Sequence, residues 1–313
     1  MDEPRYYNPH IKEMWLSEVD LDKYPNGFWD VLFKKYAPIE EEFGKDLSNF
    51  TKTEITSAYK RQNYKSFETL MVININLKNY TKWAMQHAIV EDGMNHYDDF
   101  THEQLLSCVN QRQLKGSILT RDELLNGIRG LNNAVDAFML LALFEGIRGK
   151  RCEELINLTI DDFDFDIKTV SLCSGRTIPV SNELLHWASL TDQELIYTGF
   201  NGKTYKLVGT KLIKKTSTFN ETKSMENSDR RIYTAVMRSL DVMGYGGMVS
   251  QNSLVTSGMI DMINRLAIEY DTSAECVLYT KSLWEQFTGV YPMSEAAKRR
   301  FLMKYKDFFV EPD

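Results

Sequence analysis

Residues 134–164 read AVDAFMLLALFEGIRGKRCEELINLTIDDFD, and this stretch decides the fold. Its first part is apolar nearly all round, which is typical of a helix buried at the centre of a domain. A turn with two glycines follows, and residues 152–165 then predict a second helix with a strongly acidic end. The stretch therefore predicts a mainly helical domain built around one buried helix.

The segments that follow predict a small β-sheet and further helices. Residues 168–181, KTVSLCSGRTIPVS, alternate around a Ser-Gly pair and predict a β-hairpin. Residues 205–217 fit either a strand or a short helix, and their periodicity does not decide between them. Helical spacing returns in residues 253–270 and in residues 293–309, the latter capped by Ser294.

Helix signals dominate the first half of the chain. Phe67 to Met85 places apolar residues at three- and four-residue spacing and predicts a long amphipathic helix. The polar stretch from Asn110 to Ser117 is interpreted as a linker. We therefore expect an N-terminal segment (1–25), a small helical domain (26–112) and a larger domain (117–313). Capping boxes, in which a Thr and an acid or amide three residues later satisfy free N–H groups, are predicted at Thr51/Glu54, Thr101/Gln104 and Thr120/Glu123.

The net charge of −7 hides an uneven distribution. Taken alone, an acidic balance argues against a polyanionic partner such as DNA. Residues 1–50 and 151–200 hold most of the acidic surplus, with net charges of −5 and −6, whereas residues 201–250 carry a net charge of +5. The total charge therefore does not exclude a nucleic-acid partner for the basic stretch.

Cysteine usage and hydropathy indicate a cytoplasmic protein. Cys108, Cys152, Cys173 and Cys276 are far apart and form no CxxC pair, which favours reduced thiols. The longest apolar run, Ala137 to Phe144, has eight residues, far fewer than the ~20 that span a bilayer. The N-terminus lacks the apolar core of a signal peptide. No histidine or cysteine spacing predicts a metal site, and no Gly-rich loop indicates a nucleotide cofactor.

A capped helix (119–123) is followed by a buried helix ending in Gly-x-Arg, by Arg-x-x-Glu-Leu, by an acidic turn and by a hairpin with Arg-Thr-x-Pro. This order resembles the catalytic domain of tyrosine recombinases, the phage integrases. Arg151 matches the first catalytic arginine of that family, with Glu154, Leu155, Leu158 and Asp162 at the family's spacing. Residues 65–85 are similar to a helix of the family's core-binding domain. The resemblance implies a mainly α fold with a small β-sheet, in which a helical core-binding domain precedes a degenerate catalytic-like domain.

The catalytic-like domain is called degenerate because several family residues are missing. Those enzymes hold a scissile phosphate with two arginines, a histidine and a lysine and attack it with a tyrosine. Asn252 and Val255 stand at the family's histidine and second arginine, and the hairpin lysine is absent. No histidine follows His186. Tyr291 and Tyr279 lie nearest to the expected nucleophile, and neither is in register. The resemblance thus implies that no catalytic residues remain.

Candidate DNA contacts follow from the resemblance and from basic residues near phosphate-binding elements. Arg151 is predicted as an inherited phosphate contact, with Arg148 and Lys150 beside it. A basic turn precedes the helix at Phe67, and Arg176 matches a family position in the hairpin. The candidate DNA-binding residues are Lys60, Arg61, Lys65, Ser66, Arg148, Lys150, Arg151, Arg176, Lys211, Lys214, Lys215, Arg230 and Arg231.

The resulting hypothesis is a sequence-specific double-stranded DNA-binding protein that has lost strand cleavage and regulates phage or prophage genes, as a repressor. An active, divergent integrase and a protein-interaction module are the open alternatives. A peptide or protein antagonist is a further hypothesis about partners. Another is self-association through the C-terminal helix, in which Phe301, Leu302 and Tyr305 pack in cis or in trans. A solvated-surface role stays open for each basic residue.

Overall fold

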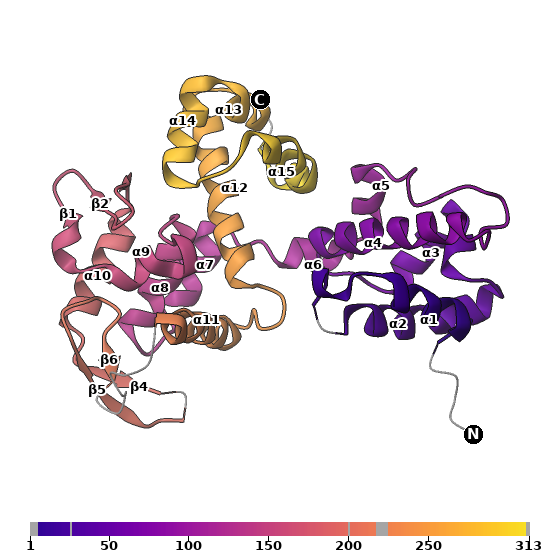
Figure 1. The fold of residues 1–313 in the computed structure, drawn as a ribbon. Helices are drawn as coiled ribbons and strands as arrows, with labels where there is room; N and C mark the ends of the chain where they lie inside the picture. Colours follow the sequence, from indigo (N-terminus) through magenta and orange to yellow (C-terminus); the bar gives the residue numbers. More distant parts are fainter. Residues whose placement is uncertain (1–5, 26, 200, 217–224, 311–313) are drawn as a thin grey trace. The chain divides into compact units, whose positions relative to one another are not determined.

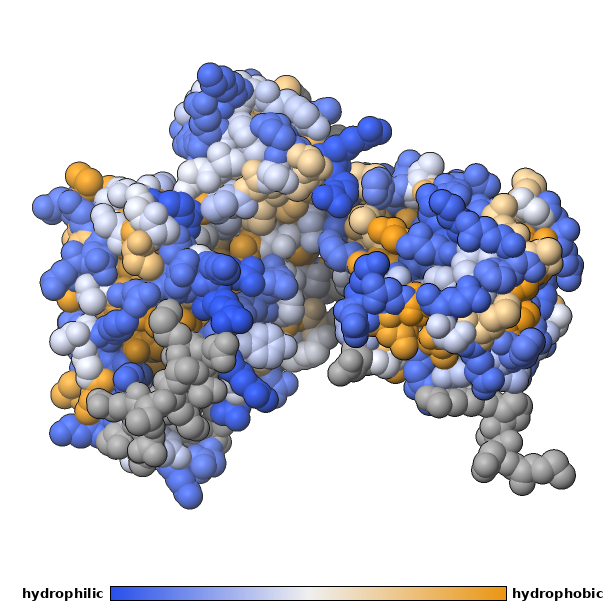
Figure 2. Space-filling view, viewed as in Figure 1, coloured by the Kyte–Doolittle hydropathy of each residue, from blue (hydrophilic) through white to orange (hydrophobic). Residues whose placement is uncertain are grey.

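The computed structural model describes residues 6–25, 27–199, 201–216 and 225–310. It divides into two compact units, Met1–Leu114 and Lys115–Asp313, which are described separately (Figure 1). The fold class is mainly α with small antiparallel sheets, as predicted. No described helix is both long and apolar enough to span a membrane. Hydrophilic residues cover most of the face shown in Figure 2, with smaller hydrophobic areas between them.

The first unit is helical and has an aromatic core. Trp29, Tyr36, Tyr59, Tyr80 and Tyr97 are all nearly inaccessible to solvent. The elements are α1 (Pro9–Glu18), η1 (Leu21–Lys23), α2 (Phe28–Phe43), η2 (Leu47–Asn49), α3 (Lys52–Arg61), α4 (Phe67–Gln86) and α5 (His102–Ser107), and α6 (Gln111–Gly116) spans the boundary between the units. The capping boxes predicted at Thr51 and Thr101 are present, so the starts of α3 and α5 are confirmed.

A fully buried lysine ties α1 into this unit, although the sequence predicts a separate N-terminal segment. Lys12 Nζ lies 2.7 Å from Glu40 Oε1 and 2.8 Å from Asp46 Oδ2, and it donates to the Tyr80 hydroxyl at 3.1 Å. Its partners come from α2, the cap of η2 and α4, so one cation joins three elements to α1. Burial raises the pKa of Glu40 to about 7 against the opposing effect of Lys12, and nearby Asp46 adds to the increase.

This raised pKa predicts a pH-dependent stability. The folded protein keeps a proton on Glu40 that the unfolded chain releases above its ordinary value of 4.5, so the free energy of unfolding should fall as pH rises from about 4.5 to about 7. Glu40→Gln should flatten part of this slope in urea unfolding measured across that range. Glu41→Gln, at an exposed neighbour, is the matched control, and an unchanged slope in Glu40→Gln would contradict the assignment.

The second unit is built around α8 (Ala134–Phe144). Val135 to Phe144 are all buried, as the apolar sequence predicts, and α10, α11 and α12 pack against this helix (Figure 1). The helices before the C-terminal region are α7 (Arg121–Ile128), η3 (Lys150–Cys152), α9 (Glu153–Asn157), η4 (Ile160–Asp162), α10 (Asn182–Gln193), α11 (Met225–Val242) and α12 (Gln251–Glu269). Those that follow are α13 (Ala274–Tyr279), α14 (Lys281–Val290), η5 (Glu295–Ala297), α15 (Lys298–Tyr305) and η6 (Lys306–Phe308). The capping box at Thr120 is also confirmed.

Two small antiparallel sheets flank these helices. The predicted hairpin is confirmed, with Val170 opposite Ile178. The undecided stretch after residue 204 forms strands. The first sheet has the order β1 (Phe163–Asp164), β2 (Thr169–Ser171), β3 (Thr177–Pro179), and the second has the order β4 (Ile196–Thr198), β5 (Thr204–Val208), β6 (Lys215–Thr216).

The polar stretch predicted as a linker contains the boundary between the two units, at Leu114 and Lys115, and it is mostly helical in α6. Two local predictions need correction. The helix after Cys152 ends at Asn157, and the acidic residues beyond it form η4 and β1. Ser294 makes no side-chain capping bond, and the C-terminal helix is divided into η5, α15 and η6.

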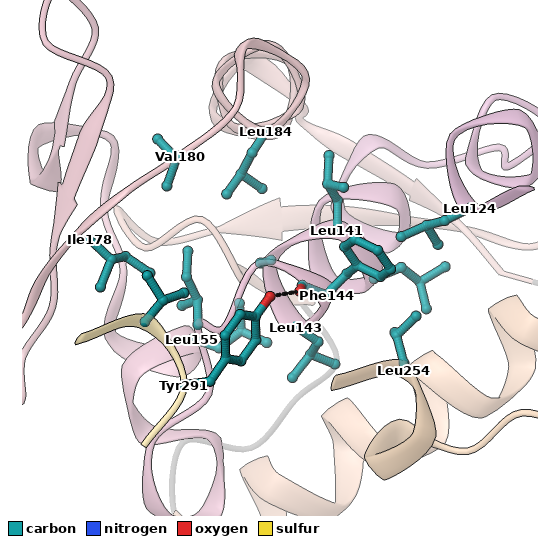
Figure 3. Packing of buried hydrophobic residues seen from close by; sticks show 14 of the residues in the cluster. Leu124, Leu141, Leu143, Phe144, Leu155, Ile178, Val180, Leu184, Leu254 and Tyr291 are labelled. Carbon is teal, nitrogen blue, oxygen red and sulfur yellow. Dashed lines mark hydrogen bonds between the residues drawn. The ribbon is translucent and has the colours of Figure 1, made fainter. Parts of the chain in front are cut away.

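Close approach between helices fixes the centre of this core. At Gly258 in α12, an added Cβ would lie 1.7 Å from the carbonyl oxygen of Phe144 in α8. The Tyr291 hydroxyl donates to the same oxygen, as Figure 3 shows. A glycine is therefore needed where α12 crosses the end of α8, and the end of α14 is held at the same point.

Candidate nucleic-acid interface

The loop that joins α8 to α9 carries the best-matched candidate residue, Arg151. Gly146, Gly149, Arg151 and Cys152 all have positive φ angles, and the Arg151 backbone is left-handed at φ 53° and ψ 35°. Two consecutive non-glycine residues in this region cost energy and persist only when their surroundings hold them. The Arg151 side chain is exposed, as is that of Lys150, and Arg148 is half-buried.

Buried Glu154 holds the loop between α8 and α9 through hydrogen bonds. It accepts the Arg148 backbone N–H at 3.1 Å, the Ser174 hydroxyl at 2.5 Å and two guanidinium N–H groups of Arg176. Burial tends to raise the pKa of Glu154, but the bonds from Arg176 and Ser174 outweigh it and the net pKa lies below the usual value. The hairpin and the Arg151 loop are thus joined through one ionised carboxylate.

Arg176, a candidate DNA contact, has an internal role in the structure. Besides Glu154, its guanidinium donates to the carbonyl oxygens of Gly146, Gly289 and Val290, at 3.2, 3.1 and 2.7 Å. These bonds join the hairpin to the α8–α9 loop and to the end of α14. We therefore leave Arg176 out of the proposed DNA contacts.

The N-terminus of α12 lies against the same loop. Buried Gln251 donates from Nε2 to Cys152 Sγ at 3.0 Å, so their neighbours Asn252 and Arg151 lie on adjoining segments. Burial raises the pKa of the Cys152 thiol, although hydrogen bonds with Gln251 and Arg148 oppose this effect. Asn252 is exposed, while Val255 is half-buried and packs against the core. Neither side chain carries a positive charge.

A second cation reaches α9 from the segment after β5. Lys211 Nζ donates to Asn157 Oδ1 at 2.5 Å, and the Leu212 N–H bonds the Leu158 carbonyl at 2.9 Å. A five-residue helix is about 7.5 Å long. Arg151 and Lys211 therefore lie at the two ends of α9, although they are 60 positions apart in the sequence.

The start of the described part of α11 adds further positive charge. This helix packs against both η3 and α9, and Asp229 is close enough to Cys152 to influence its pKa. Arg230 is exposed and Arg231 half-buried. Together with Lys211 and Lys215 they line a groove of about 680 Å³. Burial lowers the pKa of Arg231.

Lys214 differs from its basic neighbours because it is buried. Its Nζ donates to the carbonyl oxygens of Thr191, Asp192 and Glu194 at the end of α10. A cation that satisfies the last carbonyls of a helix stabilises the helix C-terminus. Lys214 therefore has a structural role, and we also leave it out of the proposed DNA contacts.

The basic candidates of the first unit surround the turn between α3 and α4. Lys60 and Lys65 are exposed. Arg61 forms an exposed ion pair with Glu42, of the kind that contributes little to stability. Ser66 caps α4 by accepting the Thr69 N–H, and it donates to Glu68. The turn is held by Asn63, whose Oδ1 accepts from Asn110 at 2.8 Å.

The two tyrosines considered as nucleophiles lie in unsuitable places. Tyr291 is buried, its hydroxyl donates to the Phe144 carbonyl, and burial raises its pKa well above the usual value (Figure 3). Its oxygen is therefore occupied by an internal hydrogen bond and is shielded from solvent. Tyr279 is 53 % exposed, but its ring lies 5.3 Å from Lys298 Nζ, against α15.

The C-terminal helix packs in cis within the second unit. Phe301 and Leu302 lie against its core and Tyr305 is buried. Asn264 of α12 donates to the Phe308 carbonyl and accepts the Val310 N–H. No group of three metal-ligating side chains occurs among the described residues.

Two residues of the interface were missed by sequence reasoning. Asn157 positions Lys211, and nothing in the local sequence indicates that contact. Arg238 lines the groove with Arg231 and Thr234. Its spacing of seven residues from Arg231 on a helix is a signal that could have identified it.

Comparisons with known families give two matches. The models are described as the MrpR C-terminal catalytic domain, which matches residues 118–302, and the MrpR N-terminal core-binding domain, which matches residues 6–86. A search of curated protein sequences gives no significant match.

Among solved structures, the chain is similar to the Tn1549 transposon integrase (residues 82–397) in complex with circular intermediate DNA, with 14% identity, a TM-score of 0.40 and coverage of 94% of this chain and 98% of that one. It is also similar to a lambda integrase (75–356) dimer bound to a COC′ core site, with 13% identity, a TM-score of 0.43 and coverage of 97% and 96%. For the integrase from mycobacterium phage Brujita the values are 11%, 0.33, and 96% and 93%.

Proposed function

Because the chain belongs to the MrpR family, whose domain models match residues 6–86 and 118–302, we propose that it binds double-stranded DNA sequence-specifically. The observation that best supports this proposal is the cluster of basic residues around α9. Arg151 lies at one end of this helix and Lys211 at the other, and α11 brings Arg230 to the same region. Such a group of exposed cations matches the regular negative charge of a DNA backbone.

The DNA contacts that we propose are a subset of the candidate residues. They exclude Arg176 and Lys214, each of which is largely shielded from solvent and donates to two or more backbone carbonyls, and Ser66, which serves as a cap. The proposed phosphate contacts are Lys60, Arg61, Lys65, Arg148, Lys150, Arg151, Lys211, Lys215, Arg230 and Arg231. Base or shape recognition is assigned to the α3–α4 turn and the start of α4.

We further propose that the protein does not cleave DNA. Asn252 and Val255 lack the cationic groups that would stabilise charge on a phosphoryl oxygen. The Tyr291 hydroxyl is buried and bonded to a carbonyl oxygen. A recombinase-like fold with these substitutions keeps its means of holding a duplex without the means of attacking it.

A DNA-binding protein without cleavage chemistry suits transcriptional regulation. We propose that it acts as a repressor of phage or prophage genes in the cytoplasm of a bacterial host. In its recombinase-like order and lost catalytic residues it resembles the integrase-fold master repressor of SPβ-like Bacillus phages. Self-association through exposed residues of α15 stays a hypothesis, although Phe301, Leu302 and Tyr305 pack within the second unit.

The test begins by selecting bound fragments of phage and host genomic DNA with the purified protein. The recovered site is then made into a nicked suicide substrate, which traps any covalent protein–DNA adduct. We expect a retarded complex that weakens steeply with salt and no adduct above background. An active tyrosine recombinase serves as the positive control for adduct formation. An adduct that disappears in Tyr291→Phe or Tyr279→Phe would establish a recombinase instead, and absence of any complex at low salt would reject DNA binding.

A further inference from the structure

The groove beside α11 has a floor that DNA binding does not explain. Its base is apolar, formed by the side chains of Val135, Met139, Ile156, Ile213, Ile232 and Ala235. Cationic residues, among them Lys211, Lys215 and Arg230, line the same groove. Its volume of about 680 Å³ lies within the range of ligand pockets, ~300–1,000 Å³. Phosphates of a rigid duplex can contact the cations, but they gain nothing from an apolar base.

A buried carboxylate also lines this groove. Asp136 is only 2 % exposed, and its Oδ2 accepts from Asn133 Nδ2 at 2.7 Å. Its Oδ1 has no partner at full hydrogen-bond geometry among the described residues, but the Tyr197 hydroxyl interacts with the same carboxylate. Burial raises the pKa of Asp136 to about 6, and the bonds from Asn133 and Tyr197 partly oppose this effect. Protein donors therefore hold this carboxylate, and it is not assigned a ligand contact.

The apolar base and the cationic lining select one class of ligand. An apolar base takes aliphatic side chains, and cationic residues take carboxylates. A nucleotide would supply the negative charge, but Tyr197 is the only aromatic side chain for stacking a base among the described residues that line the groove.

We propose that this groove binds a short acidic peptide segment with aliphatic side chains, and that the peptide competes with DNA. The competition rests on the proposed DNA-binding function, because Lys211, Lys215 and Arg230 would serve both ligands. The groove is thereby a regulatory site, at which occupancy by a peptide lowers affinity for the operator.

The test uses two libraries of free hexapeptides and the full chain. One library combines Asp and Glu with Leu, Ile and Val, and the other replaces the acids by Lys and Arg. Fluorescence anisotropy should show binding of acidic members and none of basic ones. Ala235→Phe, which fills the groove from α11 without removing a cation, should weaken this binding at least about tenfold. Ala296→Phe, at an exposed position in η5, should leave it unchanged.

Displacement of labelled DNA completes the test. Acidic peptides should displace DNA from the wild-type chain, whereas Ala235→Phe should bind DNA normally and resist displacement. Arg230→Glu, at an exposed site, provides a second variant that does not disturb packing, and it should also weaken peptide binding. The groove assignment is overturned if no acidic peptide binds below about 1 mM, or if both variants bind peptide like the wild type. Peptide binding in the groove without any DNA binding would reject the DNA-binding proposal alone.

Discussion

The double variant Arg151→Ala/Lys211→Ala is expected to bind DNA about 100-fold more weakly than the wild type, at specific and random sequences alike. A hydrogen bond to a charged group contributes about 1.5–3 kcal/mol, which corresponds to roughly tenfold or more for each cation. Both residues are proposed to contact phosphates, and such contacts carry no sequence information. The slope of log affinity against log salt should also decrease by about 0.9 for each residue removed.

This prediction is measured by DNA-binding titrations between about 50 and 200 mM salt, a range in which phosphate contacts are strongly weakened. Arg299→Ala/Lys306→Ala removes the same charge from exposed residues of α15 and η6 and is the matched control. Alanine and arginine both carry a Cβ atom, so the left-handed backbone at position 151 costs the same in the variant. The substitution therefore does not change the conformational strain of the loop. Equal affinities for the double variant and the control would show that the ends of α9 do not contact DNA.

Gly258→Ala is expected to lower the free energy of unfolding by about 2–4 kcal/mol. Its new Cβ would lie 1.7 Å from the Phe144 carbonyl oxygen and 2.5 Å from the Tyr291 hydroxyl. Backbone atoms must therefore move apart, which costs packing, and the hydrogen bond of Tyr291 is disturbed. The measurement is urea unfolding followed by circular dichroism.

Gly289→Ala is the control for this substitution. Gly289 lies in α14, its φ is not positive, and a Cβ there would meet nothing within 4 Å. Because alanine favours helix over glycine by up to about 1 kcal/mol, this variant should be neutral or slightly more stable. A Gly258→Ala protein as stable as Gly289→Ala would mean that α12 and α8 do not approach each other as described.

The local structure of this chain could largely be predicted, because its causes are local. Capping boxes at Thr51, Thr101 and Thr120 involve residues three positions apart, and all three are present. The burial of α8 follows from its own composition. The segment after Tyr205 could not be assigned, because short strands depend on pairing with other segments, here β4 with β5 and β5 with β6.

The candidate site shows the limit of such reasoning. Arg151, Arg176 and Lys214 are all basic residues at plausible positions, but their surroundings differ. The partners of Arg176 include Gly289 and Val290, more than 110 positions away. Lys214 contacts carbonyls at the end of α10, about 20 positions earlier. The members of each pair are far apart in the sequence, so a short-range pattern does not predict their contact. Only the tertiary structure distinguishes a basic residue with internal hydrogen bonds from one whose charge is exposed.

The sequence by itself determined the helical elements, the buried α8 and the hairpin, because each is a matter of composition or short-range spacing. Tertiary structure alone decided which basic residues are exposed and which are internal. It placed Arg151 and Lys211 at the two ends of α9, buried the Tyr291 hydroxyl, and put the carboxylate of Asp136 among apolar side chains. The physical reason is that burial and hydrogen bonding depend on which distant segments pack together, and a local pattern does not contain that information.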